Sequence, residues 1–275
     1  MLKTILLGLD GSPHCEACVD LALRWAKQFD CMLVALGIVD EPSIRGDATW
    51  EGRRVTAVFD HLVEDARHRI EGILEKFALR CSEEQVAFKL LEDVGYPDAQ
   101  IFRESERYDL IMLGTQTYFH ADTQTRPCKT LESVLRNAPR PVTAVPQAAN
   151  DGEGILIAYD GSLQAARTLQ AFVSSGLPPL GGVEVVYVGS EKSVAAAKVV
   201  DRAIDFLSFH DIPARPKKIV TLDPPGKALV AAAAKQNAGL LVMGAFGQPK
   251  IREFFVGSVT CTVLQSTQVP VFLYH

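Results

Sequence analysis

Four residues near the end of the sequence have types and a spacing suited to binding phosphate. Gly244 and Gly247 are followed, after nine further residues, by Gly257 and Ser258. An apolar run at 239–243 precedes this pattern, and a stretch with helical character follows it. Backbone N–H groups in the first turn of a helix lack intrahelical partners and suit an incoming anion. We therefore expect a strand, a long loop and a helix start that together hold a phosphorylated ligand.

The pattern lies in the second of two similar halves of the chain. Segments 5–12 and 155–162 are both apolar runs that end in Asp-Gly-Ser. Two further pairs of segments match in the same order, 108–114 with 238–244 and 133–142 with 262–271. Three matches in one order predict an internal duplication. We place the two copies at 1–147 and 153–275, joined by a short linker at about 147–153.

Each copy alternates apolar strands with helices. In the second copy we expect strands near 154–159, 183–188, 216–221, 239–243 and 270–274, and helices near 163–175, 192–209, 226–236 and 258–266. The strands are continuous runs rich in Val, Ile and Leu, which is typical of strands covered on both faces. The sequence therefore predicts an α/β fold with a mostly parallel open sheet in each copy. The first copy is longer in the middle, where residues 41–60 contain a loop signal.

An acidic residue is expected beside the glycine pattern. Asp160 ends the first expected strand of the second copy, and Gly244 ends the fourth. Ligands of open parallel sheets bind outside the carboxyl ends of the strands, where the strand order reverses. If these strands are neighbours, the Asp160 carboxylate could accept hydrogen bonds from ribose hydroxyls or an amine. Asp-Gly-Ser is also ordinary turn and helix-cap chemistry, so Asp160 or Ser162 could simply cap the next helix.

These residues together resemble the universal stress protein family in a tandem arrangement. Nucleotide-binding members carry Gly-x-x-Gly, nine residues, and then Gly-Ser or Gly-Thr, which the second copy matches without a gap. The Asp-Gly-Ser openings and the Pro-Val endings match in both copies. The resemblance implies an adenine nucleotide α-hydrolase-like fold with five-stranded sheets of order 3-2-1-4-5. It also implies that the copies pair through their last strands, around 142–146 and 270–274, as an internal pseudo-dimer.

The resemblance further implies an ATP site in the second copy, with or without Mg²⁺. By position, the adenine pocket would lie near Ala158, Asp160 and Val188. The ribose and phosphates would meet Gly244, Phe246, Gly247, Gly257, Ser258, Val259 and Thr260. Phe246 departs from the basic or polar residue common at its position. Lys250 and Arg252 could supply charge to the phosphates, or they could be solvated loop cations.

The first copy departs further from the nucleotide motif. Gly114 is followed by Thr115, Gln116 and Thr117, so the second glycine is missing. Cys128-Lys129 replaces the Gly-Ser pair, with one extra residue in the loop. Side chains at these positions would crowd a phosphate, although Asp10 remains. We expect that the first copy does not hold ATP in the family's manner and is either structural or binds something else.

Histidines and cysteines give weaker candidates for chemistry. His14, Cys15 and Cys18 open an amphipathic helix, but no second Cys pair completes a metal or redox site. His61 and His68 share a helix face without the further ligands that zinc needs. The six cysteines show no disulfide framework. We therefore expect no metal site.

Charge and hydropathy limit the class of partner. The chain has 275 residues and a net charge of −5. Residues 151–275 contribute +1, from 11 Lys and Arg against 10 Asp and Glu, which leaves −6 for residues 1–150. The absence of a basic stripe argues against nucleic acid. No apolar stretch reaches the roughly 20 residues that span a bilayer, and the first residues do not resemble a signal peptide. We expect a cytoplasmic protein without a membrane partner.

Three functions stay open at this stage. The leading expectation is a stress-response regulator that binds ATP or a related adenine nucleotide in its second copy and is read by an unidentified protein partner. Two such chains could associate again as a homodimer. The alternative is a slow ATPase or phosphotransferase, although Asp160 is the one obvious carboxylate and phosphoryl transfer normally needs metal-holding carboxylates. The third is an interaction scaffold without nucleotide.

Overall fold

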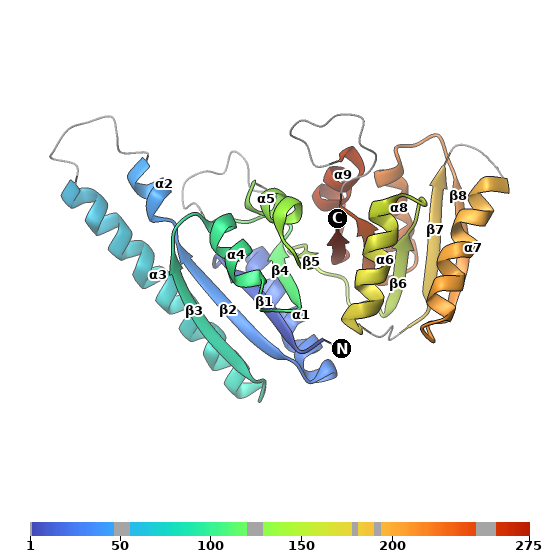
Figure 1. The fold of residues 1–275 in the computed structure, drawn as a ribbon. Helices are drawn as coiled ribbons and strands as arrows, with labels where there is room; N and C mark the ends of the chain where they lie inside the picture. The colour runs from blue at the N-terminus through green and yellow to red at the C-terminus, as the bar shows by residue number, and fades with distance from the viewer. Residues whose placement is uncertain (1, 47–55, 120–128, 178–180, 190–193, 246–256) are drawn as a thin grey trace. The chain divides into compact units, whose positions relative to one another are not determined.

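The computed structural model describes residues 2–46, 56–119, 129–177, 181–189, 194–245 and 257–275. The chain divides into two compact units, residues 2–140 and residues 141–275. Each unit combines a sheet with helices on its two faces (Figure 1). Among the described helices, none is both long and apolar enough to cross a membrane.

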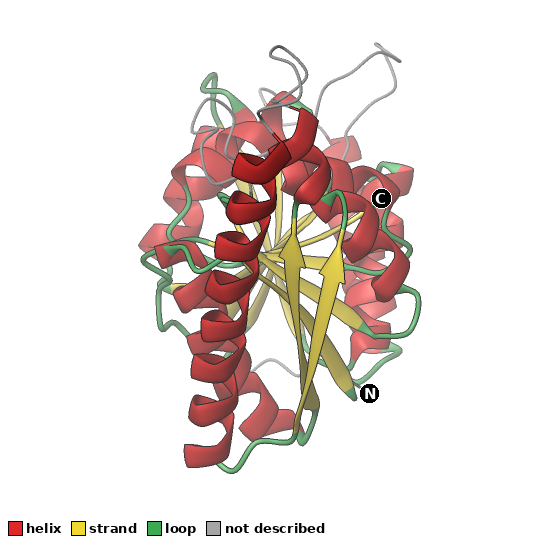
Figure 2. Cartoon of the chain, turned by 90° about the vertical axis from the view of Figure 1, so that its left-hand side faces the viewer, coloured by secondary structure: helices red, strands yellow, loops and turns green. Residues whose placement is uncertain are grey.

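The first unit contains four parallel strands in the order β3-β2-β1-β4. The strands are β1 (Thr4–Leu9), β2 (Met32–Val39), β3 (Phe88–Val94) and β4 (Leu110–Gly114). The helices are α1 (Pro13–Phe29), α2 (Glu41–Gly46), α3 (Thr56–Glu83), α4 (Pro97–Ser105) and α5 (Lys129–Asn137). The long helix α3 runs along β2 and β3 (Figure 2). Right-handed crossovers place α1 and α3 on one face of the sheet and α4 on the other.

The second unit repeats this plan and gains one strand. Its strands are β5 (Val142–Val145), β6 (Gly154–Ala158), β7 (Val183–Gly189), β8 (Ala214–Val220), β9 (Ala238–Gly244) and β10 (Val271–Tyr274). Its helices are α6 (Leu163–Ser175), α7 (Val194–Ser208), α8 (Pro225–Lys235) and α9 (Ser258–Ser266). The order is β5-β10-β9-β6-β7-β8, and all neighbours are parallel except β5 and β10. The elements predicted for the second copy are confirmed, with boundaries within two residues of those expected.

Strand β5 ends the first sequence repeat but lies in the second unit. It pairs antiparallel with β10, with Thr143 opposite Phe272. This pairing confirms the one expected between the last strands of the two copies. Numbered within each repeat, the strands follow the order 3-2-1-4-5, as expected. The repeat boundaries 1–147 and 153–275 describe the duplication rather than the compact units, and they stay a prediction.

The buried strands and the helix caps explain why the elements begin and end as they do. Every residue of β2 after the first is buried, as is every residue of β4, which requires helices on both sides. Ser12 caps α1 by accepting the N–H of Cys15, and Ser162 caps α6 in the same way. In the core of the second unit, Phe172 and Phe272 meet edge to face with ring centroids 5.9 Å apart.

The loop signal at 41–60 is wrong for its first residues, which form the short helix α2. Asp40 accepts the N–H of Ser43 on its Oδ1 at 3.2 Å, and its carbonyl accepts the N–H of Ile44. These bonds start a helical turn that the sequence pattern alone does not favour. Arg45 then pairs with Glu41 on α2 and with Asp60 on α3. Tertiary contacts therefore stabilise a turn that composition assigns to a loop.

Candidate functional site

The predicted site residues of the second repeat gather at the carboxyl ends of β6 and β9. The two strands are parallel neighbours, with Ile157 opposite Val242. This arrangement meets the condition set by the sequence, that the first and fourth strands of the repeat lie side by side. Asp160 and Gly244 therefore follow adjacent strands at one edge of the sheet. That edge is where open parallel sheets bind their ligands.

Among the described residues, one oxygen of the Asp160 carboxylate accepts a hydrogen bond and the other does not. Its Oδ1 accepts the N–H of Ser162 at 2.9 Å, across a turn in which Gly161 has φ +80°. Ser162 in turn caps α6 through its own hydroxyl. No described residue donates to the second carboxylate oxygen, and the Asp160 side chain is exposed. A role in the turn and the helix cap therefore explains one of the two carboxylate oxygens of Asp160.

Gly244 lets the end of β9 approach the first turn of α6 closely. A Cβ on Gly244 would lie 3.1 Å from the backbone nitrogen of Ala165 and from Cβ of Gln164. The next residue, Ala245, is buried and donates its N–H to the carbonyl of Tyr274 at 2.8 Å. A larger residue at 244 would push this strand end outward and move the chain that leads toward α9.

The start of α9 offers backbone donors. Gly257 is the N-cap residue, and as a glycine it has no side chain that could accept from the first N–H groups of the helix. The N–H groups of Ser258, Val259 and Thr260 lie in the first turn, where a helix cannot pair them internally. The hydroxyl of Thr260 is committed elsewhere, because it donates to the carbonyl of Ala245 at 2.7 Å and is buried. Thr260 thus ties α9 to the end of β9 and can offer a ligand only its backbone.

The remaining predicted residues lie on the strands or outside the described part of the chain. Ala158 is half-buried at the end of β6, and Val188 is half-buried near the end of β7. Phe246 and Gly247 lie outside the described residues, as do Lys250 and Arg252. Of the ten predicted site residues, the structure therefore describes eight, in elements that end at or start from this edge of the sheet.

Two tyrosines beside Asp160 were not identified from the sequence. Tyr159 donates its N–H to the carbonyl of Val186 and, by the register of β6 and β7, lies next to Tyr187. Both side chains are half-buried. Burial raises the pKa of Tyr159, and the charge of Asp160 adds to the rise while Arg202 opposes it. The position of Tyr159 directly before Asp160 is the signal that could have identified it.

In the first repeat, the chain itself crosses the equivalent crevice, and a hollow of about 370 Å³ lined by Asp10 and Tyr118 stays beside it. Asp10 accepts the N–H of Ser12 on Oδ1 at 2.9 Å, as Asp160 does with Ser162. Its second oxygen, Oδ2, accepts the N–H of Tyr118 at 2.6 Å. The segment that follows β4 therefore crosses the carboxyl end of β1. Both oxygens of Asp10 are engaged within the protein.

That segment is packed as well as hydrogen-bonded. Thr115, Thr117 and Phe119 are buried, with 3%, 8% and 5% of their surfaces exposed. Thr115 contacts Nδ1 of His14 through its hydroxyl at 3.2 Å, and the hydroxyl of Tyr118 donates to Gln116 at 2.7 Å. In this segment, Thr117 stands at the position where the family motif has its second glycine.

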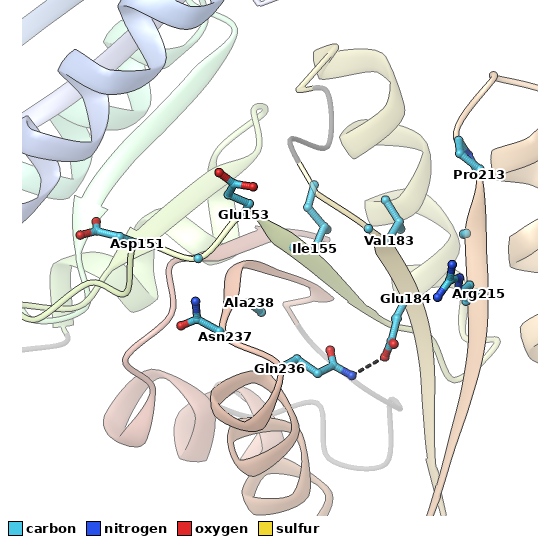
Figure 3. A pocket seen from close by; sticks show the side chains of 14 residues that line it. Asp151, Glu153, Ile155, Val183, Glu184, Pro213, Arg215, Gln236, Asn237 and Ala238 are labelled. Carbon is cyan, nitrogen blue, oxygen red and sulfur yellow. Dashed lines mark hydrogen bonds between the residues drawn. The ribbon is translucent and has the colours of Figure 1, made fainter.

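A wide hollow lies at the opposite end of the strands. It encloses about 900 Å³ at the amino ends of β6, β7, β8 and β9. Figure 3 shows Glu184 within it, held by Gln236. Lys217 also contacts Glu184, at 3.1 Å. The hollow is wide and open, its charged lining is of mixed sign, and Glu184 is already held by Gln236 and Lys217, so we do not assign the ligand site to it.

Metal and thiol chemistry finds no support in the described part of the chain. Its His, Cys, Asp and Glu residues form no group of three that could hold a metal ion. Burial raises the pKa of Cys15 to about 12 and that of Cys18 well above its ordinary value. Neutral buried thiols are poor nucleophiles and poor ligands. His61 and His68 are exposed and face carboxylates on their own helix.

Comparisons with known proteins agree with this architecture. A model of the Universal stress protein family matches residues 1–146 and 153–275. Universal stress protein Slr1230 of Synechocystis sp. (strain ATCC 27184 / PCC 6803 / Kazusa) is 25% identical over 173 residues, 61% of this chain and 58% of that protein. The chain thus spans about three fifths of the length of that curated relative.

Solved structures of similar extent share the fold. A universal stress protein from Archaeoglobus fulgidus DSM 4304 is 20% identical with a TM-score of 0.72, covering 98% of this chain and 97% of that chain. The functionally unknown protein PA1789 from Pseudomonas aeruginosa PAO1 is 15% identical with a TM-score of 0.60, covering 99% and 92%. At these identities the likeness shows the fold alone.

Proposed function

Because the chain belongs to the universal stress protein family, we propose that its second repeat binds ATP or a closely related adenine nucleotide. One observation carries the proposal, namely the difference between the two equivalent aspartates. Asp10 has both carboxylate oxygens engaged by backbone N–H groups, whereas no described residue donates to the second oxygen of the exposed Asp160. A carboxylate oxygen that accepts from no described residue, at the carboxyl edge of a parallel sheet, suits a ribose hydroxyl or an adenine amine.

Each described residue of the second crevice has a role in this proposal. Ala158 and Val188 form apolar walls for the base. The second carboxylate oxygen of Asp160 accepts from the ribose, and the small Gly244 lets the backbone approach the ligand. The N–H groups at the start of α9 bind the phosphates, where the helix dipole also favours negative charge. The family motif extends the site to Phe246 and Gly247.

A magnesium ion fits this arrangement only as part of the nucleotide complex. Asp160 is the one described carboxylate at the crevice among the predicted site residues. Mg²⁺ commonly keeps several waters and binds through phosphates with one or two carboxylates. We infer that Mg²⁺, when present, arrives with the phosphates and takes few ligands from this chain.

We propose that the bound nucleotide is a regulatory signal, read by a protein partner, rather than a substrate. Phosphoryl transfer needs a residue that orients the nucleophile as well as charge stabilisation. The described residues around Asp160 supply backbone donors, apolar walls and tyrosines, but no second carboxylate, His or Lys among the predicted site set. Cys15, Cys18, Cys31 and Cys81 are free cysteines, which supports action in a reducing compartment such as the cytoplasm.

Calorimetry with paired variants tests the binding proposal. We expect ATP to bind the full chain with one site, and Asp160→Ala to weaken binding by roughly tenfold, the value of one hydrogen bond to a charged group. The matched control is Asp10→Ala in the first repeat, which should leave the affinity and the stoichiometry unchanged. Equal loss in both variants, or two sites per chain, would contradict the assignment to the second repeat.

A slow ATPase is the competing function, and the same variants separate it from binding alone. Phosphate release by the purified protein should not exceed that of Asp160→Ala at saturating ATP. A rate that falls with Asp160→Ala while the occupancy of the site is held constant would favour an enzyme instead.

A further inference from the structure

The segment Thr115–Phe119 follows β4 at the place where the second repeat starts its nucleotide motif, yet it lies folded into the first crevice. We propose that this segment is a built-in occupant of the first crevice, taking the place that an adenine base and its ribose take in the second. The identity of the replaced ligand rests on the function proposed above. The observation that the segment lies across this crevice is independent of that function.

The polar part of the replacement is the hydrogen bond to Asp10. The N–H of Tyr118 donates to Oδ2 of Asp10 at 2.6 Å. The equivalent oxygen of Asp160 is the one left for a ribose hydroxyl in the proposed nucleotide site. A backbone N–H and a sugar hydroxyl are both single donors, so either can satisfy this carboxylate oxygen. Tyr118 thus supplies from within the chain what a nucleoside would supply from outside.

The apolar part of the replacement is the ring of Phe119. Gly8 stands at the position equivalent to Ala158, a wall of the proposed base pocket. Cζ of Phe119 lies 3.2 Å from the point where a Cβ on Gly8 would stand. Phe119 as a whole is buried, with 5% of its surface exposed. A planar aromatic side chain therefore lies against the strand at the position where the second repeat would hold a planar base.

Contacts within the segment and to α1 hold it in place. Thr115 is tied to His14 at the start of α1. Gly114 allows the turn, since a Cβ there would lie 2.6 Å from the carbonyl oxygen of Gln116 and from Cβ of His14. The hydroxyl of Tyr118 closes the segment by donating to Gln116. The occupant of this crevice is therefore part of the chain, and it stays in place whatever the nucleotide concentration.

The proposal predicts that removing the ring creates a pocket for a planar base. The experiment uses the full chain, and the intact chain gives the contribution of the second repeat to any effect of adenine. Phe119→Ala should lower the melting temperature by roughly 10 °C, as expected for a large buried aromatic side chain in a domain of this size. Millimolar adenine should then raise the melting temperature of Phe119→Ala by a few degrees more than that of the intact chain, because a ligand that binds only the folded state stabilises it.

Phe77→Ala is the matched control. Phe77 is a buried phenylalanine of the same unit, on α3, packed edge to face against Phe88. It should cause a comparable loss of melting temperature, with no recovery in adenine beyond the effect on the intact chain. If Phe119→Ala does not fold, Phe119→Leu leaves a smaller pocket and is measured in the same way. Hydrogen exchange at the amides of β1 and β4 locates the protection in the first unit.

Two results would overturn the proposal. One is the absence of adenine rescue in the folded Phe119 variants, or equal rescue in Phe77→Ala. The other is rescue by toluene but not by adenine, which would make the site an ordinary apolar core cavity. Because the intact chain, Phe119→Ala and Phe77→Ala all carry the same second repeat, the difference in rescue between them is independent of whether that repeat binds ATP.

Discussion

The two crevices of this chain begin with the same residues and end differently. Both open with Asp-Gly-Ser, and in both the aspartate Oδ1 accepts the serine N–H at 2.9 Å. In the first repeat the chain after β4 turns back and fills the second oxygen, whereas no described residue does so in the second. The aspartate is therefore a poor indicator of ligand binding by itself. In the first repeat, the segment after the fourth strand engages the second oxygen.

The largest effect expected from this comparison is on nucleotide affinity at the start of α9. Gly257→Asp places a carboxylate where we propose that phosphates meet backbone N–H groups, and it should weaken ATP binding by about a hundredfold, roughly 3 kcal/mol. Titration calorimetry measures this change. Lys129→Asp, at the first residue of α5 in the other repeat, also introduces a carboxylate at a helix start, changes the net charge by two rather than one, and should leave the affinity unaltered. A similar loss from both would mean a general electrostatic effect.

The next effect concerns stability and separates the two aspartates. Asp10→Asn replaces one of the two carboxylate oxygens by an amide NH2, which cannot accept from a backbone N–H, and we expect it to cost about 2 kcal/mol of unfolding free energy. Asp160→Asn affects an exposed side chain with one engaged oxygen and should cost less than about 1 kcal/mol without nucleotide. Urea unfolding of each variant gives the comparison. Equal costs would show that the Tyr118 contact adds no stability.

The smallest effect is expected where α9 is tied to the end of β9. Thr260→Val removes the buried hydroxyl that donates to Ala245 and leaves that carbonyl unpaired, which should cost about 1–2 kcal/mol. Thr262→Val on the same helix removes only a local bond to the carbonyl of Ser258, so it should cost a few tenths of a kcal/mol at most. Denaturant midpoints for the two variants test the difference, and a reversed order would contradict it.

The strands, the order of the helices and the position of Asp160 could be predicted because they follow from local patterns that occur twice. Continuous apolar runs identify buried strands, and the duplication gives each run a counterpart in the other half. The loss of the nucleotide motif after Gly114 was likewise predicted from the residue types alone. These features depend on short segments whose side chains decide their own structure.

The segment that lies across the first crevice and the neighbouring positions of Tyr159 and Tyr187 could not be predicted in this way. Burial of Phe119 depends on the space beside Gly8, and the contact between Tyr118 and Asp10 joins residues more than 100 positions apart. The proximity of Tyr159 to Tyr187 depends on the register of two strands rather than on their sequences. Arg45 of the short helix α2 pairs with Asp60, which lies on the next helix. Such features are set by tertiary contacts, which override local preference.

The placement of β5 in the second unit also determines which fragments of this chain keep β10 paired on both sides. A fragment that begins at residue 141 keeps β5 against β10 and so covers that side of the sheet, whereas a fragment that begins at residue 153 leaves the N–H and C=O groups of β10 without their antiparallel partner. Open strand edges pair with other chains. The shorter fragment should therefore self-associate through β10, so that twelve residues outside the second repeat determine whether that repeat remains a monomer in isolation.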